Sequence, residues 1–275
     1  MACLNPFLLR DLGEIISVPC GRCLNCRIAN AYQWSKRIAL EVEEHKENCF
    51  ITLTYEKPEP AYNIRHIQLF FKRLRKRINK KIMYYLVGEL GSKTRRVHYH
   101  AIIFGFRPDD LVLYKTRPHN LYISNLLTEA WKHGHVVIGD VNDKTINYCT
   151  GYITKDFGSM DVNPMTGELL KPFMTCSKRP AIGRRYFDRL DQSTINERDY
   201  IYFKGSKDLL PKYFNRLIND SLDEKQHKIR KLRKYKLVSI TNNNLIAAFG
   251  SEQKLNSYRL KKATSIYELK KQKTL

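Results

Sequence analysis

Residues 82–104 read IMYYLVGELGSKTRRVHYHAIIF, and the fold class follows from this stretch. Two runs rich in β-branched and aromatic residues, Ile82–Leu90 and Val97–Phe104, flank the polar segment 91–96. Such runs around a short polar loop predict a β-hairpin. The loop resembles a phosphate-binding loop, but Ser92 interrupts the Gly-Lys-Thr order and the spacing is short. We therefore expect no ATPase or helicase activity from this chain.

Helices and strands alternate on both sides of the hairpin. Helices are expected at residues 28–47, 63–78, 120–132 and 143–156, and further strands at 49–55 and 135–140. Asp143 is expected to cap the last of these helices, despite the internal Gly151. Strands interleaved with helices, including a hairpin, predict an α+β domain in which helices cover one face of an antiparallel sheet.

The two ends of the chain differ in composition from this central part. Residues 1–27 are cysteine-rich and are expected to be loop-like, whereas residues 221–275 carry 14 Lys and Arg against four Asp and Glu. The tail also shows partial helical periodicity. We therefore divide the chain into a cysteine-rich head at 1–27, a central domain at 28–215 and a basic, partly helical tail at 216–275.

The charge of the whole chain points to an anionic partner. Forty-nine Lys and Arg against 27 Asp and Glu give a formal net charge of +22, and such a surface attracts a polyanion. A basic surface kept for solubility is the alternative. Nucleic acid is favoured over a membrane, because no segment has the pattern of an amphipathic anchor or approaches the roughly 18 apolar residues of a membrane span. The N-terminus lacks a signal-peptide pattern, so the protein is expected to stay in a reducing cytoplasm.

Three residues of the hairpin form a candidate metal site. His98 and His100 are separated by one residue in a strand, so both imidazoles face the same side, about 7 Å apart along the chain. Glu89 lies near the end of the partner strand and completes a set of two histidines and one carboxylate. This set suits Mg²⁺ or Mn²⁺ with open positions for water and phosphate oxygens. The alternatives are ordinary strand histidines and a surface carboxylate.

A second group of residues lies on the expected helix at 143–156. Tyr148, Tyr152 and Lys155 are four and then three residues apart, so they share one helical face. A phenol has a pKa near 10, and a tyrosine nucleophile needs help in losing its proton. A neighbouring ammonium group could supply that help or neutralise charge on a phosphate. The alternative is an aromatic stripe in the core, although a core does not welcome an unpaired lysine.

The cysteines divide into a cluster and three scattered residues. Four thiolates, enough for a tetrahedral zinc site, come from Cys3, Cys20, Cys23 and Cys26. In a reducing compartment clustered cysteines indicate a metal before they indicate disulfides, although these four could also be reduced and free. The other three are expected to be ordinary buried thiols and are Cys49, Cys149 and Cys176.

These motifs, in this order, resemble a known superfamily. Phe50–Tyr55, His98–His100 and Tyr152–Lys155 resemble the three motifs of HUH endonucleases that initiate rolling-circle replication. The chain is more closely similar to the replication initiators of Microviridae phages, especially the gokushovirus group. The matching segments are Pro19–Arg27, Gln33-Trp34, Asn48–Tyr55, Gly88–His100, Tyr148–Lys155 and Pro180–Arg184. The resemblance covers roughly residues 1–215. Leu90 and Ala181 depart from the usual Tyr and Gly, and neither is a proposed ligand or nucleophile.

The resemblance implies a fold and a mechanism. The sheet would have about five strands, with the metal-binding histidines on a central strand and the tyrosine helix packed over them. A tyrosine would attack the scissile phosphate and leave a 5′-phosphotyrosyl link and a 3′-hydroxyl. Tyr152 is expected to make the first cut, because it fits the YxxK motif of the superfamily, and Tyr148 to serve in the second transfer.

The implied partners are single-stranded and supercoiled viral DNA, with the helicase and DNA polymerase of an infected bacterial host, in whose cytoplasm the protein would act. Two other readings remain open. One is a single-strand transposase of the same chemistry, since a conjugative relaxase normally places its tyrosine before the histidines. The other is a zinc-stabilised nucleic-acid-binding protein without catalysis, which would not account for the tyrosines and lysine on one helical face. A nicking assay with Mg²⁺ separates these classes.

Overall fold

The structure is a computed structural model that describes residues 3–91, 95–155, 161–163, 165–191, 195 and 198–272. The chain forms two compact units, Trp34–Asp188 and a second one built from both ends, Met1–Gln33 with Arg189–Leu275. The division passes through helix α1 (Leu24–Glu43). The predicted domains instead end at residues 27 and 215, and that division remains a prediction.

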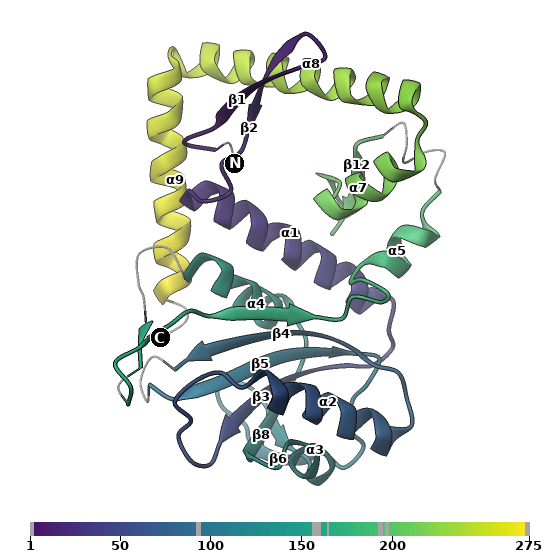
Figure 1. Ribbon diagram of the computed structural model, residues 1–275, viewed down its shortest axis with the longest axis vertical. Coiled ribbons are helices and arrows are strands. Elements are labelled where there is room, and N and C mark those ends of the chain that lie inside the picture. Colours follow the sequence, from purple (N-terminus) through teal and green to yellow (C-terminus); the bar gives the residue numbers. More distant parts are fainter. Residues whose placement is uncertain are drawn as a thin grey trace. The chain divides into compact units, whose positions relative to one another are not determined.

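An antiparallel sheet of seven strands forms the centre of the unit 34–188 (Figure 1), in the order β11-β4-β5-β3-β8-β7-β6. Its strands are β3 (Asn48–Tyr55), β4 (Met83–Leu90), β5 (Val97–Phe104), β6 (Val112–Lys115), β7 (Leu121–Ile123), β8 (Gly134–Gly139) and β11 (Phe173–Cys176). The predicted α+β class and the hairpin β4–β5 are confirmed. The predicted number of about five strands is too low, because β6, β7 and β11 have only three or four residues and too short a pattern to be recognised.

Helices cover both faces of this sheet, and not one face as predicted. On one face α2 (Ile64–Ile78) and α3 (Asn125–Trp131) share a buried core with the sheet. On the other face α4 (Asp143–Lys155) and the second half of α1 form a separate buried core (Figure 1). Six consecutive residues of β4 and of β5 are buried. Such continuous burial is the pattern of strands that are covered on both sides.

Side chains at the helix ends explain where α2 and α4 begin. Asn63 Oδ1 accepts a hydrogen bond from His66 N at 3.2 Å and caps α2. At the start of α4, Asn142 Oδ1 accepts from the backbone N of Lys144 and of Thr145, at 2.9 and 3.1 Å. The capping residue is therefore Asn142, and not Asp143 as predicted. Asp143 lies in the first turn, where a negative charge complements the helix dipole. In α3 the helix begins only at Asn125, because β7 occupies residues that were predicted to be helical.

The second unit contains hairpins and helices. Its elements are β1 (Phe7–Asp11), β2 (Glu14–Val18), β12 (Tyr200–Phe203), β13 (Ser206–Leu209), α7 (Lys212–Ser221), α8 (Glu224–Phe249) and α9 (Glu252–Gln272), with α5 (Arg184–Arg189) crossing from the other unit. The head is thus not loop-like throughout, since β1 and β2 pair through a turn at Leu12 and Gly13, both with positive φ. The predicted partial helicity of the tail is confirmed by α8 and α9. None of the helices within the described residues is long and apolar enough to cross a membrane.

One glycine of the sheet should be essential for folding. Gly134, at the start of β8, has φ +144°, and a Cβ there would meet Glu56 N at 2.3 Å and Thr54 O at 2.5 Å. We expect Gly134→Ala to destabilise the protein by about 3 kcal/mol, because the clash is with backbone and adds to the conformational strain. The matched control is Gly151→Ala in α4, where a Cβ would meet nothing within 4 Å. This change should stabilise by roughly 0.5–1 kcal/mol. Urea unfolding measures both, and equal midpoints would contradict the expectation.

Candidate metal and tyrosine site

The antiparallel pairing of β4 and β5 brings the three predicted metal ligands together. Glu89 lies opposite His98 in the register, and the next pair along the same face sets Val87 opposite His100. Glu89 Oε1 is 2.8 Å from His98 Nε2 and 2.9 Å from His100 Nε2. The ligand atoms of all three lie within 4.8 Å of one another. The hairpin therefore forms a group able to hold one metal ion, as predicted from the spacing.

The second ring nitrogen of each histidine is occupied by a neighbour. His100 Nδ1 is 3.0 Å from Thr52 Oγ1, which lies opposite His100 on β3. His98 Nδ1 donates to the carbonyl oxygen of Arg96 at 3.1 Å. In a neutral ring, a proton on Nδ1 leaves the lone pair on Nε2 free for a metal, and such hydrogen bonds fix the orientation of ligand histidines. Sequence analysis did not identify Thr52, although its place on the same strand face as Phe50 is a readable signal.

The donor set fits a divalent cation. Two imidazole nitrogens and one carboxylate leave further coordination positions open on one ion. Glu89 and His100 are 4% and 6% exposed, and a carboxylate buried to this degree needs a positive partner. A surface carboxylate, the alternative for Glu89, is therefore excluded by its burial.

Helix α4 places both predicted tyrosines over this group. The Tyr148 hydroxyl donates to Glu89 Oε1 at 2.8 Å and lies 3.2 Å from His100 Nε2. The ring of Tyr152 is nearly parallel to that of His100, with centroids 6.2 Å apart, and perpendicular to that of Tyr148. On its other side His100 stacks with Phe50 at 5.7 Å. Tyr152 is also a member of the buried core, so the core packing considered as the alternative coexists with a position beside the metal ligands.

The surroundings of the two hydroxyls oppose their ionisation. Burial, and next the negative charge of Glu89, raise the pKa of the Tyr148 phenol above its usual value. Burial also raises the pKa of Tyr152, with smaller contributions from Tyr148 and Glu89. Both phenols therefore remain protonated in the protein alone, and a nucleophilic tyrosine here requires added positive charge. Lys155 is the last residue of α4, and its side chain lies outside the described part of the chain.

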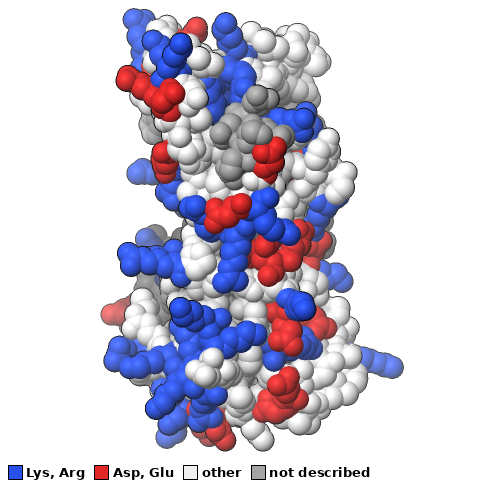
Figure 2. All heavy atoms as spheres, turned by 90° about the vertical axis from the view of Figure 1, so that its right-hand side faces the viewer, with Lys and Arg blue, Asp and Glu red and all other residues white. Residues whose placement is uncertain are grey.

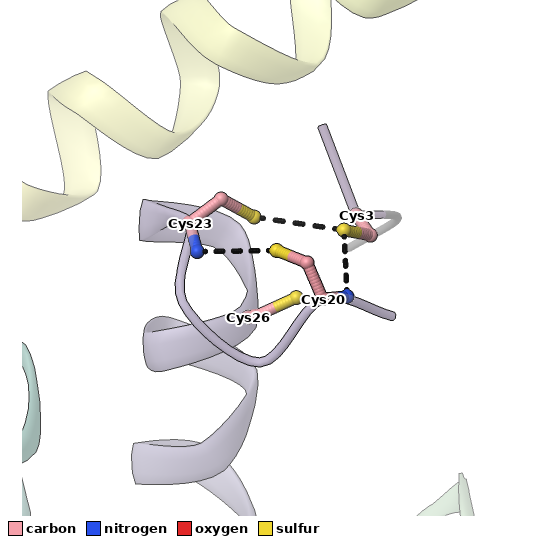
Figure 3. A group of neighbouring side chains, drawn as sticks. All are labelled: Cys3, Cys20, Cys23 and Cys26. Atoms are coloured by element: carbon pink, nitrogen blue, oxygen red, sulfur yellow. Dashed lines mark hydrogen bonds between the residues drawn. The ribbon is translucent and has the colours of Figure 1, made fainter. Parts of the chain in front are cut away.

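The predicted cysteine cluster is brought together in the second unit. The sulfur atoms of Cys3, Cys20, Cys23 and Cys26 lie within 4.8 Å of one another (Figure 3), and all four are free cysteines. Of the three scattered cysteines, the thiols at positions 49 and 149 are fully buried, as expected, whereas the one at position 176 is only half-buried.

Comparisons with known proteins connect this site to DNA replication in phages. Residues 48–157, which run from β3 through the tyrosine helix, match the model of a family of replication-associated proteins of the ORF2 type. The chain is 29% identical to replication-associated protein ORF2 of Spiroplasma virus 4, over 90% of this chain and 85% of that protein. It is 28% identical to protein VP4 of Bdellovibrio phage phiMH2K, over 71% and 65%, and 32% identical to protein ORF4 of Chlamydia phage 1, over 75% and 55%. Both of these are likewise named replication-associated proteins. No solved structure matches the chain. The resemblance inferred from the motifs is confirmed by these matches.

Proposed function

Because this chain is a phage replication-associated protein, we propose that it nicks DNA at a specific site and transfers the strand to one of its own tyrosines, in order to start rolling-circle replication. One observation carries the proposal. The Tyr148 hydroxyl is hydrogen-bonded to Glu89 and adjacent to His100, so a phosphate held at the metal ligands would be within reach of a tyrosine on α4. This juxtaposition of phenol, carboxylate and imidazoles suits phosphoryl transfer.

Glu89, His98 and His100 would hold Mg²⁺ or Mn²⁺. Such an ion would act as a Lewis acid on the scissile phosphate and offset the charge of Glu89. The residues of the chain then have separate roles. Thr52 and the Arg96 carbonyl orient the imidazoles, and the rings of Phe50 and His100 restrict where Tyr148 can lie.

The transfer itself is an exchange of one phosphodiester for another. The tyrosine oxygen forms a bond to phosphorus, the bond to the 3′ oxygen breaks, and a free 3′-hydroxyl remains for a polymerase to extend. Tyr152 makes the first cut, and Tyr148, one helical turn away, accepts the strand in the second transfer. Lys155 assists by neutralising charge on the phosphate or on the attacking phenol. The alternation of two tyrosines supports release of a closed circle after one round.

The substrates are single-stranded and supercoiled viral DNA. The net charge of +22 supports this assignment, and Figure 2 shows a face on which Lys and Arg side chains cover more surface than Asp and Glu. Strand separation and synthesis are assigned to the helicase and DNA polymerase of the infected bacterial host, and the protein to the cytoplasm of that host.

The decisive experiment looks for a covalent adduct. Full-length protein is incubated with circular single-stranded DNA of the phage and Mg²⁺ or Mn²⁺, denatured in detergent and digested for mass spectrometry. A DNA-linked tyrosine peptide from α4 is expected. Binding without any cleavage with either metal would overturn the proposal and favour a non-catalytic nucleic-acid-binding protein. Joining of a cut strand into a different DNA molecule, in place of circle closure, would favour the single-strand transposase.

The basic tail is proposed to follow the DNA backbone. Four exposed lysines of α8 and α9, namely Lys228, Lys236, Lys254 and Lys261, are changed to Gln. If each contacts one phosphate of a single strand, the slope of log affinity against log salt should fall by up to about 3, at roughly 0.7 per contact.

A matched variant controls for the loss of net charge. It carries Gln at four exposed lysines of α2 and the turn after it, Lys72, Lys76, Lys80 and Lys81. Because α2 covers the face opposite the tyrosines, this variant should keep the slope of the unmodified protein. Fluorescence anisotropy at increasing salt measures both. Equal losses in the two variants would show that only net charge matters.

A further inference from the structure

We propose that the cysteine cluster of Cys3, Cys20, Cys23 and Cys26 binds one structural zinc ion, which fixes the first turn of α1 where α9 packs on it. This site lies in the unit formed by the two chain ends. It is independent of the nicking chemistry, which is assigned to residues of the other unit.

The spacing of the sulfur atoms is that of ligands around one ion. In a tetrahedral site with zinc–sulfur bonds of about 2.3 Å, the sulfurs are about 3.8 Å apart. Cys3 Sγ and Cys23 Sγ are separated by 3.8 Å, and all four sulfurs lie within 4.8 Å. A disulfide would need about 2.05 Å. Four thiolates gathered without a cation would repel one another, so a divalent metal is the partner that this arrangement requires.

The backbone around the cluster supports thiolate ligands. Gly21 has φ +74°, which allows the chain to turn tightly between Cys20 and Cys23. Cys23 N then donates to Cys20 Sγ at 3.3 Å, and Cys20 N donates to Cys3 Sγ at 3.2 Å (Figure 3). Hydrogen bonds from backbone N–H groups stabilise the charged form of a sulfur ligand.

The position of the cluster gives the ion a structural role. Cys23 immediately precedes α1, and Cys26 lies in its first turn. One turn further, Leu24 and Ile28 pack against the buried Ala263 of α9, together with two partly buried residues of the same helix. An ion held by the cluster therefore fixes the helix end that carries this contact.

The N-terminal hairpin also depends on such an ion. Strands β1 and β2 lie between Cys3 and Cys20, so ligation closes the loop that contains them. Four of their apolar side chains are more than half exposed and are Phe7, Leu8, Leu9 and Ile15. A two-stranded hairpin with so little buried surface is marginal without a staple.

Metal analysis tests the site directly. Protein expressed in zinc-replete medium should contain about one equivalent of zinc per chain, and Co²⁺ should replace it with the visible spectrum of a tetrahedral thiolate complex. Cys20→Ser should lower the zinc retained at least about tenfold. The control is Cys176→Ser, which removes a half-buried thiol outside the cluster and should retain the full equivalent. Zinc-free protein that also fails to bind Co²⁺, a site filled by iron, or a disulfide within the cluster would overturn the proposal.

Amide exchange tests the structural role without requiring a folded variant. When a chelator removes the ion from the unmodified protein, exchange in residues 7–18 and 252–272 should rise by about tenfold or more, and zinc should reverse the change. Strands β4 and β5 of the other unit should keep their protection. Unchanged exchange in α9 after complete removal of the metal would overturn the role assigned to the ion.

Discussion

Tyr152→Phe should remove the first covalent adduct with single-stranded DNA and lower the rate of nicking at least about 10⁴-fold. The change deletes only the hydroxyl, which is the proposed nucleophile. The ring stays close to parallel to His100 and remains in its buried core, so the fold should keep its melting temperature within a few degrees. A loss of this size with an intact fold separates a chemical role from a packing role.

Tyr148→Phe should give a different result. This variant should still form the first adduct through Tyr152, but on a substrate with two origins it should fail to release closed circles. Tyr85→Phe is the matched control, because Tyr85 is fully buried in the same core on the same strand as Glu89 and should nick and circularise normally. A denaturing gel and a circularisation assay provide both readouts. If Tyr152→Phe keeps the adduct and Tyr148→Phe loses it, the first cut belongs to Tyr148, whose hydroxyl touches Glu89.

Much of this site could be predicted because its parts are local in sequence. Glu89 and the two histidines belong to one hairpin, so alternation along two strands was enough to place them on one face. The two tyrosines and Lys155 are on one helix, whose 3.6-residue period sets their shared face. The helix at 63–78 was placed within one residue, because a strong apolar stripe and the capping Asn63 both mark it.

What could not be predicted depends on packing between segments that are distant in sequence. The hydrogen bond between Thr52 and His100 exists because β3 pairs with β5, and the contact between Tyr148 and Glu89 because α4 packs on that sheet face. No local pattern specifies either arrangement. The helices on the second face were missed for a similar reason, since a continuous apolar run is compatible with several kinds of burial. The short strand β11 is a strand only because it pairs with β4.

Loss of the metal ligands should be as severe for cleavage as loss of the nucleophile, but it should leave DNA binding intact. We expect His98→Ala, His100→Ala and Glu89→Gln each to lower nicking by about 10³-fold or more, because a Lewis acid on the phosphate contributes several kcal/mol to the transition state. Affinity for single-stranded DNA should change less than about threefold, because it comes chiefly from basic residues. His119→Ala, at an exposed histidine between β6 and β7, is the control and should behave as the unmodified protein.

The readout that distinguishes a metal ligand from a merely structural histidine is binding of the metal itself. Electron paramagnetic resonance counts free Mn²⁺, so titration of each variant gives its affinity without any cleavage. Removal of one ligand should weaken Mn²⁺ binding at least about tenfold. Thr52→Val should weaken it by a smaller factor, because only the hydrogen bond that orients His100 is lost. Unchanged Mn²⁺ affinity in His98→Ala and His100→Ala would refute the metal site. Unchanged nicking in the double variant would show that the histidines take no part in the reaction.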